Sequence, residues 1–224
     1  MCFSPEVDLV ASVAIGAVAF ETIRHNHHIR TLPIALVPAI FAIHTFSSAF
    51  VWLGFEGHVS LSVQHWAINV YLAIAFILWP TFVPFTLLCI EPIGWRRNTL
   101  GVLFMLGAIT SAIYQVAIRD GNGSATELAH YIDFHVGGTP YFTGALYFMT
   151  TTISVLLSGQ RPLVLWGLVN TAVVLVLVAS QNHGLPSLWC FWAACTSAFV
   201  LWFIRTLETN QQAGIDWPWL VKEQ

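Results

Sequence analysis

Seven apolar stretches dominate the sequence, and they constrain the fold more than any motif does. A helix needs about 20 apolar residues to cross the hydrocarbon core of a bilayer, and each stretch is close to that length or longer. The stretches are residues 5–23, 32–53, 63–90, 100–118, 140–157, 162–180 and 185–204. Only 8% of the residues are charged, whereas a soluble domain carries about a quarter. The sequence therefore predicts an all-α integral membrane bundle of seven transmembrane helices.

The basic residues indicate how these helices are oriented. Seven of the eight follow the first, third, fifth or seventh stretch: Arg24, Arg30, Arg96, Arg97, Arg161, Arg205 and Lys222. Only Arg119 lies in a connection on the opposite side. Because basic residues are enriched in cytoplasmic connections, this asymmetry predicts an N-terminus outside and a C-terminus in the cytoplasm.

The chain is predicted to contain one membrane domain, residues 1–205, and a cytoplasmic tail, residues 206–224. The tail is polar except for Trp217-Pro218-Trp219-Leu220, which is typical of an aromatic anchor at the membrane interface. The third stretch is too long for a straight crossing. Pro80 and Pro84 predict a kink in it, because proline lacks the backbone N–H that a helix uses.

His44 is the most conspicuous polar residue within an apolar stretch. Ser47 and Ser48 follow it at helical spacing, so imidazole and hydroxyl groups share one helix face. Ionisable groups inside a membrane are costly and usually functional. Three roles remain open for His44: a buried histidine that bonds a neighbouring helix, a metal or cofactor ligand, or an acid–base catalyst. Together with Ser48 and Asp133 it forms the predicted catalytic set.

The connection between the fourth and fifth stretches holds the densest group of polar residues, His130-Tyr131-Ile132-Asp133-Phe134-His135. In a helix His130 and Asp133 would share a face. In an extended segment Tyr131, Asp133 and His135 would share one instead. Either geometry would let a carboxylate orient an imidazole, as in metal and acid–base sites. The alternative is an ordinary polar loop with surface histidines.

Cys2 and Glu6 lie at the outer side of the predicted topology. If Met1 is removed, Cys2 would carry an amine and a thiol on one carbon, and that pair can chelate a metal or act as an N-terminal nucleophile. The alternative is that the cysteine has no role of its own.

A metal site on the outer face is the leading hypothesis for function. Imidazoles and carboxylates are the usual ligands of zinc and similar transition metals. The candidate ligands are His44, His65, His130, Asp133, His135, His183, Cys2 and Glu6. A metal-activated water would then hydrolyse a lipid-like or small amphiphilic substrate. At least three of these side chains are expected to converge within one cavity.

The alternative hypothesis is a non-catalytic membrane subunit, or a scaffold that binds haem or a pigment within a larger complex. The chain has ten Trp and sixteen Phe residues, which suit packing against a flat apolar cofactor, and His44 could be an axial ligand. Lys222 is the only lysine, so a retinal Schiff base in the last helix is excluded. No nucleic-acid partner is expected.

Five motifs are spread over nearly the whole chain: Met1-Cys2-Phe3-Ser4, Phe46-Ser47 with Phe50-Val51-Trp52-Leu53, Trp79-Pro80 with Val83-Pro84, Tyr131 with Asp133-Phe134, and Trp189-Cys190-Phe191 with Ala193-Ala194. They resemble an uncharacterised bacterial family of seven-helix membrane proteins whose members begin Met-Cys-Phe-Ser. The resemblance implies a location in the bacterial cytoplasmic (inner) membrane and no settled activity. Near positions 44 and 48 other members carry amide or acidic residues.

The chain is more loosely similar to the alkaline ceramidase and adipoQ-receptor superfamily of seven-helix hydrolases. Those enzymes hold zinc with residues of the second, third and seventh helices. This chain has the Ser and His of the second helix in reversed order. It has no acid within the third stretch except the terminal Glu91, and no histidine in the seventh. The similarity is therefore an analogy of fold and site.

Overall fold

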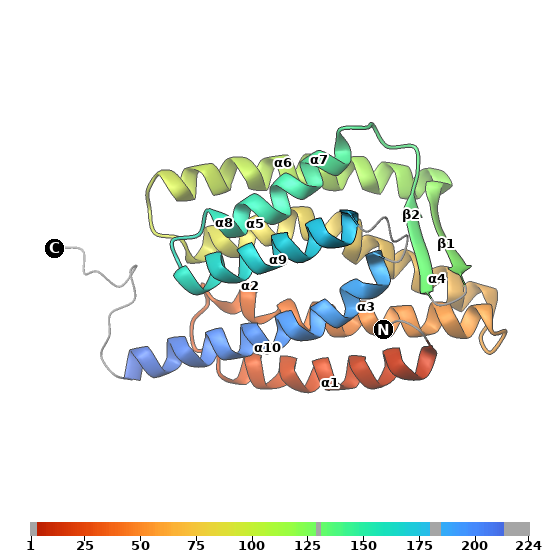
Figure 1. The fold of residues 1–224 in the computed structure, drawn as a ribbon, viewed down its shortest axis with the longest axis horizontal. Helices are drawn as coiled ribbons and strands as arrows, with labels where there is room; N and C mark the ends of the chain where they lie inside the picture. Colours follow the sequence, from red (N-terminus) through yellow and green to blue (C-terminus); the bar gives the residue numbers. More distant parts are fainter. Residues whose placement is uncertain (1–3, 129–130, 180–184, 213–224) are drawn as a thin grey trace.

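The computed structural model of the protein describes residues 4–128, 131–179 and 185–212. Over these residues the chain forms seven helical segments that run roughly along the longest axis of the molecule (Figure 1). They are α1 (Pro5–Arg24), α2 and α3 (Leu32–Ala35, Val37–Phe55), α4, η1 and α5 (Leu61–Leu72, Ala73–Leu78, Trp79–Ile90), α6 and η2 (Trp95–Ala117, Ile118–Asn122), α7, η3 and α8 (Thr143–Phe148, Met149–Ile153, Ser154–Leu156), α9 (Arg161–Ala179) and α10 (Leu185–Gln212). The segments labelled η are π-helical turns. Each segment coincides with one apolar stretch, so the predicted helical bundle is confirmed.

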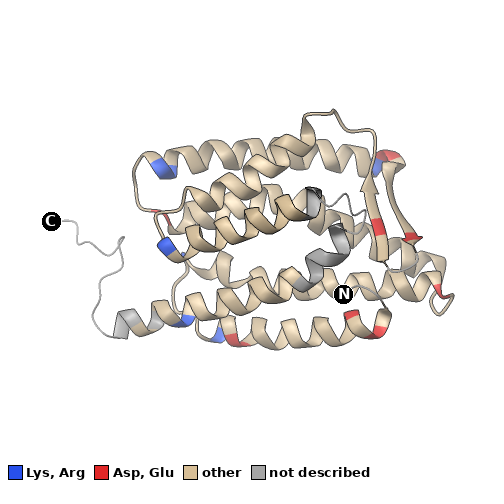
Figure 2. Cartoon of the chain, in the orientation of Figure 1, with Lys and Arg blue, Asp and Glu red and all other residues tan. Residues whose placement is uncertain are grey.

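Three of the described segments are long and apolar enough to cross a membrane: Leu32–Phe55, Leu61–Ile90 and Trp95–Asn122. Shorter apolar helices cover Thr143–Leu156, Arg161–Val176 and Trp192–Leu207. The charged residues gather at the two ends of the bundle. Figure 2 shows basic residues mainly at the end where α1 ends and α6 begins, and acidic residues mainly at the opposite end.

The first helix begins at a sequence-encoded cap and packs against α3. The Ser4 hydroxyl accepts a hydrogen bond from the Val7 backbone N–H, and Pro5 occupies the first helical position, where its missing N–H costs nothing. Further along, Ile15 of α1 packs with Phe41 of α3 in one cluster of buried side chains. This contact fixes which turns of the two helices face each other.

The interior of the bundle contains many serine and threonine residues. Most of them bond a carbonyl one turn earlier in their own helix, as do Ser47 to His44 (2.7 Å), Thr110 to Leu106 (2.8 Å) and Ser154 to Thr150. A hydroxyl bonded in this way is satisfied without any partner helix. Small polar residues can therefore line the helix contacts of a bundle that has little charge.

The long segment α4–η1–α5 leaves α-helical geometry just before Pro80. The Trp79 N–H bonds the Ile74 carbonyl, as in a π-helix, and Pro80 has no N–H to offer the Ala75 carbonyl. The Tyr147 hydroxyl from α7 donates to that carbonyl instead (2.8 Å). The Ser111 hydroxyl from α6 likewise donates to the Ile77 carbonyl. Side chains of neighbouring helices thus bond carbonyl groups of the irregular segment. The irregularity itself agrees with the kink predicted from the prolines.

Helix α6 approaches this irregular segment closely. Gly107 faces Pro80, and a Cβ atom added to Gly107 would overlap the Pro80 carbonyl oxygen. A glycine is therefore required for the observed separation of α5 and α6.

A β-hairpin connects η2, at the end of α6, to α7. The prediction of an all-α fold was therefore wrong for this connection. Strands β1 (Gly123–Leu128) and β2 (Tyr131–Val136) pair antiparallel, with Thr126 opposite Asp133. Alternate residues of β2, Ile132, Phe134 and Val136, are buried in a cluster with residues of α3, α4 and α6. The hairpin therefore covers the acidic end of the bundle (Figure 1).

The opposite end is held by a buried carboxylate. Glu91, at the end of α5, is 2% exposed and accepts the Gly159 backbone N–H on both oxygens, at 3.1 and 2.9 Å. Gly159 lies in the turn between α8 and α9, which this contact ties to the end of α5.

Candidate functional site

One face of α3 carries polar side chains that are almost completely buried. His44 is 1% exposed and Ser48 is 0% exposed, and they lie four residues apart on the same face. Thr45, next to His44, is also buried. None of the three side chains has a hydrogen-bond partner among the residues that the structure describes. Ser47 differs, because its hydroxyl bonds its own helix.

Asp8 of α1 lies beside this face. Its carboxyl group is buried, with the residue only 1% exposed, and the Ser48 hydroxyl is the side chain that interacts with it. Asp8 Oδ2 and Ser48 Oγ both lack a hydrogen-bond partner among the described residues. An unpaired carboxylate away from water is among the most costly groups a protein can bury.

The His44 ring is held by aromatic stacking. It lies against Tyr71 of α4, with ring centroids 3.9 Å apart and 28° between the planes. Tyr71 in turn stacks on Phe134 of β2, with centroids 3.5 Å apart. Asp8 lies beside Ser48, Ser48 shares a face of α3 with His44, and His44 stacks on Tyr71, so these residues join α1, α3 and α4 in one group. We refer to these four residues as the polar site.

The unpaired atoms of the polar site are unusual, because about 90% or more of buried polar groups in proteins are hydrogen-bonded. His44 leaves both Nδ1 and Nε2 without a partner in the described part of the chain, although a neutral imidazole can donate at one nitrogen and accept at the other. One carboxylate oxygen, two imidazole nitrogens and one hydroxyl of the polar site thus have free bonding capacity among the described residues. Such a group can bind a polar ligand or transfer a proton.

The other predicted site residues lie elsewhere or cannot be placed. His65 and Glu6 are exposed, on α4 and α1 respectively. Because β2 is extended, Asp133 and His135 fall on the less buried face of the strand, opposite to Phe134. His130, His183 and Cys2 lie outside the described residues. Among the described residues no three His, Cys, Asp or Glu side chains are close enough to share a metal ion.

Sequence reasoning missed two residues of the polar site, Tyr71 and Asp8, and only Asp8 could have been found. A signal was present, because Asp8 and Ser12 are one turn apart on the face of α1 that also buries Ile15, Ala19 and Thr22. A carboxylate on the buried face of an apolar helix is the pattern expected of a functional group in a membrane helix.

The donor set determines how well the polar site suits a metal. Asp8 and His44 offer one carboxylate and one imidazole, and Asp8 Oδ2 and both His44 ring nitrogens lack partners among the described residues. Zinc sites use three or four protein ligands. The polar site alone therefore provides only part of a zinc ligand set.

The fold and the polar site define a class: a helical-bundle protein with membrane-length helices and a buried polar group beneath a β-hairpin. The chain belongs to a family of unknown function (DUF6629), whose model matches residues 1–214. This membership confirms the expected assignment to an uncharacterised family. No curated protein and no solved structure matches the chain.

Proposed function

We propose that this protein crosses the membrane seven times, with its N-terminus outside, and that the polar site binds the polar head of a small amphiphilic or lipid ligand. The observation that carries the proposal is the set of atoms on Asp8, His44 and Ser48 that have no hydrogen-bond partner among the described residues. Leaving them unpaired costs about 1–3 kcal/mol for each neutral group. A ligand that supplied donors and acceptors would remove that cost.

The separation of charges along the bundle supports the proposed orientation. Basic residues lie mainly at one end and acidic residues mainly at the other (Figure 2). Under the positive-inside rule the basic end faces the cytoplasm, which puts the polar site in the outer half of the membrane. There it would be reached from the outer leaflet or from outside the cell.

Cysteine labelling in intact cells tests the topology. Ile29, Ile93 and Ser124 are exposed and lie in connections between helices or in the hairpin, so a single cysteine at each, in a chain without its native cysteines, can react. Ser124→Cys should be labelled by an impermeant reagent. Ile29→Cys and Ile93→Cys should react only after permeabilisation. The reverse pattern would refute the outer placement of the site.

A thermal-shift screen tests the ligand site. Purified protein is mixed with single-chain amphiphiles that carry amine, phosphate, hydroxyl or amide heads. A bound compound at about 100 times its Kd should stabilise the fold by about 2.7 kcal/mol. Asp8→Asn and His44→Leu should abolish the shift, and Ser47→Ala, which changes a hydroxyl bonded within α3, should keep it. Equal shifts in all four proteins would place the ligand elsewhere.

A transition-metal site for hydrolysis is the second candidate. The unpaired imidazole of His44 and carboxylate of Asp8 favour it, since both are common metal ligands. They would hold the ion, and Ser48 would orient a substrate beside it. Elemental analysis of the purified protein should then find a transition metal that Asp8→Asn and His44→Leu remove. Its absorption spectrum tests the haem or pigment alternative in the same sample.

A further inference from the structure

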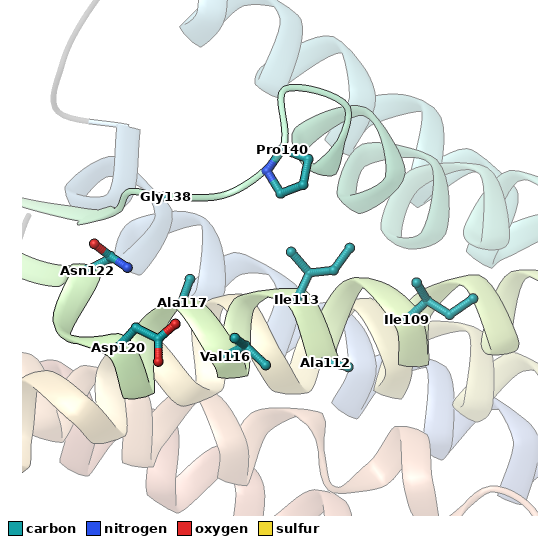
Figure 3. A pocket seen from close by; sticks show the side chains of 9 residues that line it. All are labelled: Ile109, Ala112, Ile113, Val116, Ala117, Asp120, Asn122, Gly138 and Pro140. Atoms are coloured by element: carbon teal, nitrogen blue, oxygen red, sulfur yellow. The ribbon is translucent and has the colours of Figure 1, made fainter.

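A groove lies on the outer half of α6, separate from the polar site. Its floor consists of apolar side chains of α6, among them Ile109, Ile113 and Val116, and Pro140 forms part of its opposite wall (Figure 3). Asp120 and Asn122 line the groove where η2 ends α6. Its volume of about 450 Å³ is within the range of about 300–1,000 Å³ that is typical of ligand sites.

The wall opposite α6 is fixed in place. The Gly137 N–H donates to the Asn122 carbonyl (2.9 Å), which ties the segment before α7 to the end of η2. Gly138 has φ +68°, a conformation that favours glycine, and a Cβ at that position would come 2.9 Å from Asn122 Nδ2. The groove therefore exists before any ligand binds.

The groove opens on the apolar outer surface of α6. Val102, Met105, Ile109 and Val116 are 52–60% exposed, and α6 with η2 is long and apolar enough to cross a membrane. In a bilayer these side chains would contact lipid. The apolar part of the groove would then hold an acyl chain that runs along the helix.

The end of the groove carries charge, and it lies at the end of the membrane-length segment formed by α6 and η2. Asp120 is exposed and has no ion-pair partner within 4.0 Å among the described residues, and neither has the adjacent Arg119. Arg119 is the single basic residue of the described chain at this end, where acidic residues predominate (Figure 2). Asp120 lines the groove and Arg119 precedes it in the chain. A carboxylate with a guanidinium one residue away complements a headgroup that carries both an ammonium and a phosphate.

We propose that this groove binds one phosphatidylethanolamine molecule, with an acyl chain along α6, the ammonium group at Asp120 and the phosphate near Arg119. The proposal needs only α6 to cross the membrane with Asp120 at the outer headgroup level, so it rests on the topology of the proposed function and not on the polar site.

Native mass spectrometry of protein purified in mild detergent, with equal phosphatidylethanolamine and phosphatidylglycerol added, tests the groove. Wild type should retain one phosphatidylethanolamine. Val116→Trp, which fills the groove, should reduce retention at least tenfold. Val102→Trp is the matched control, because Val102 is equally exposed on the same helix but does not line the groove. Asp120→Asn should reduce the preference for phosphatidylethanolamine about two- to fivefold.

Several results would overturn the proposal. They are equal lipid retention by Val116→Trp and Val102→Trp, a wild-type preference for phosphatidylglycerol, no lipid retained by wild type, or an unchanged preference in Asp120→Asn. The ligand shift at the polar site should be the same in Val116→Trp as in wild type. Failure of the groove proposal is therefore distinguishable from failure of the polar site, and cysteine labelling reports separately on the topology.

Discussion

The imidazole of His44 stacks on the phenol ring of Tyr71, with ring centroids 3.9 Å apart. Because Tyr71 also stacks on Phe134, its ring lies between the other two. These rings come from α3, α4 and β2, so one aromatic stack links the polar site to the β-hairpin. A change in the position of the hairpin would therefore alter the packing of the His44 ring.

His44→Leu should leave the fold as stable as wild type or slightly more stable. The change removes two ring nitrogens that have no partner among the described residues, which relieves about 1–3 kcal/mol, and it loses about 0.5–1.5 kcal/mol of stacking. The unfolding temperature in detergent measures the difference, and about 2–4 °C corresponds to 1 kcal/mol in a chain of this size. Ser47→Ala, which removes a formed hydrogen bond, is the control and should be slightly destabilised. A larger loss in His44→Leu than in Ser47→Ala would show that His44 has a structural role.

Glu91→Ala should destabilise the protein by about 2–3 kcal/mol. The buried carboxylate accepts the Gly159 N–H, and hydrogen bonds to charged groups contribute about 1.5–3 kcal/mol. Glu21 is the matched control, because it forms only partly exposed ion pairs with Arg24 and Arg205. Such pairs contribute about 0–1 kcal/mol. Thermal unfolding of the two variants should therefore differ clearly, and equal losses would contradict the proposed importance of the Gly159 contact.

Tyr147→Phe should cost about 1–3 kcal/mol, because the Ala75 carbonyl in the π-helical segment would lose the side-chain donor that replaces the missing Pro80 N–H. Tyr141→Phe is the control, since Tyr141 is 98% exposed. Thermal unfolding of both variants, measured side by side, checks the prediction. If the two unfolding temperatures were the same, the Tyr147 hydroxyl would not be needed to satisfy the kink.

The helices were predictable because their signal is local. About 20 apolar residues between arginines, prolines and polar turns suffice to define each one. The hairpin was harder to predict, because only β2 shows alternating burial, at Ile132, Phe134 and Val136, whereas β1 is mostly exposed. The sequence alone left helix and strand open for residues 130–135. Packing against the ends of α3 and α4 favours the strand.

The candidate site was only half predictable for a related reason. His44 and Ser48 are neighbours on one helix, so their spacing alone places them together. Asp8 is about 40 residues away in sequence, and its position depends on how α1 packs against α3, which apolar composition does not encode. The same limit applies to Tyr71. Asp133 was singled out for its chemistry, but the pleat of β2 directs the neighbouring Phe134 into the aromatic stack.

The contact between α5 and α6 gives the clearest test of helix packing, because α6 contains two glycines in different surroundings. A Cβ on Gly107 would overlap the Pro80 carbonyl oxygen, whereas a Cβ on Gly101 has no atom within 4 Å. Gly107→Ala must push the helices apart, and overpacking of this kind costs about 1–3 kcal/mol. Gly101→Ala should instead stabilise the helix by up to about 1 kcal/mol, because alanine has the higher helix propensity.

Gly107→Ala should therefore lower the unfolding temperature, and Gly101→Ala, the same change six residues earlier, should raise it. The Gly107→Ala variant should also weaken the hydrogen bond between Ser111 and the Ile77 carbonyl, since Ser111 lies one turn further along α6 on the same face. Combining Gly107→Ala with Ser111→Ala tests this coupling. If the backbone has already moved, the second change should cost less in the Gly107→Ala background than alone. Additive losses, or a stabilised Gly107→Ala variant, would contradict the close contact at Pro80.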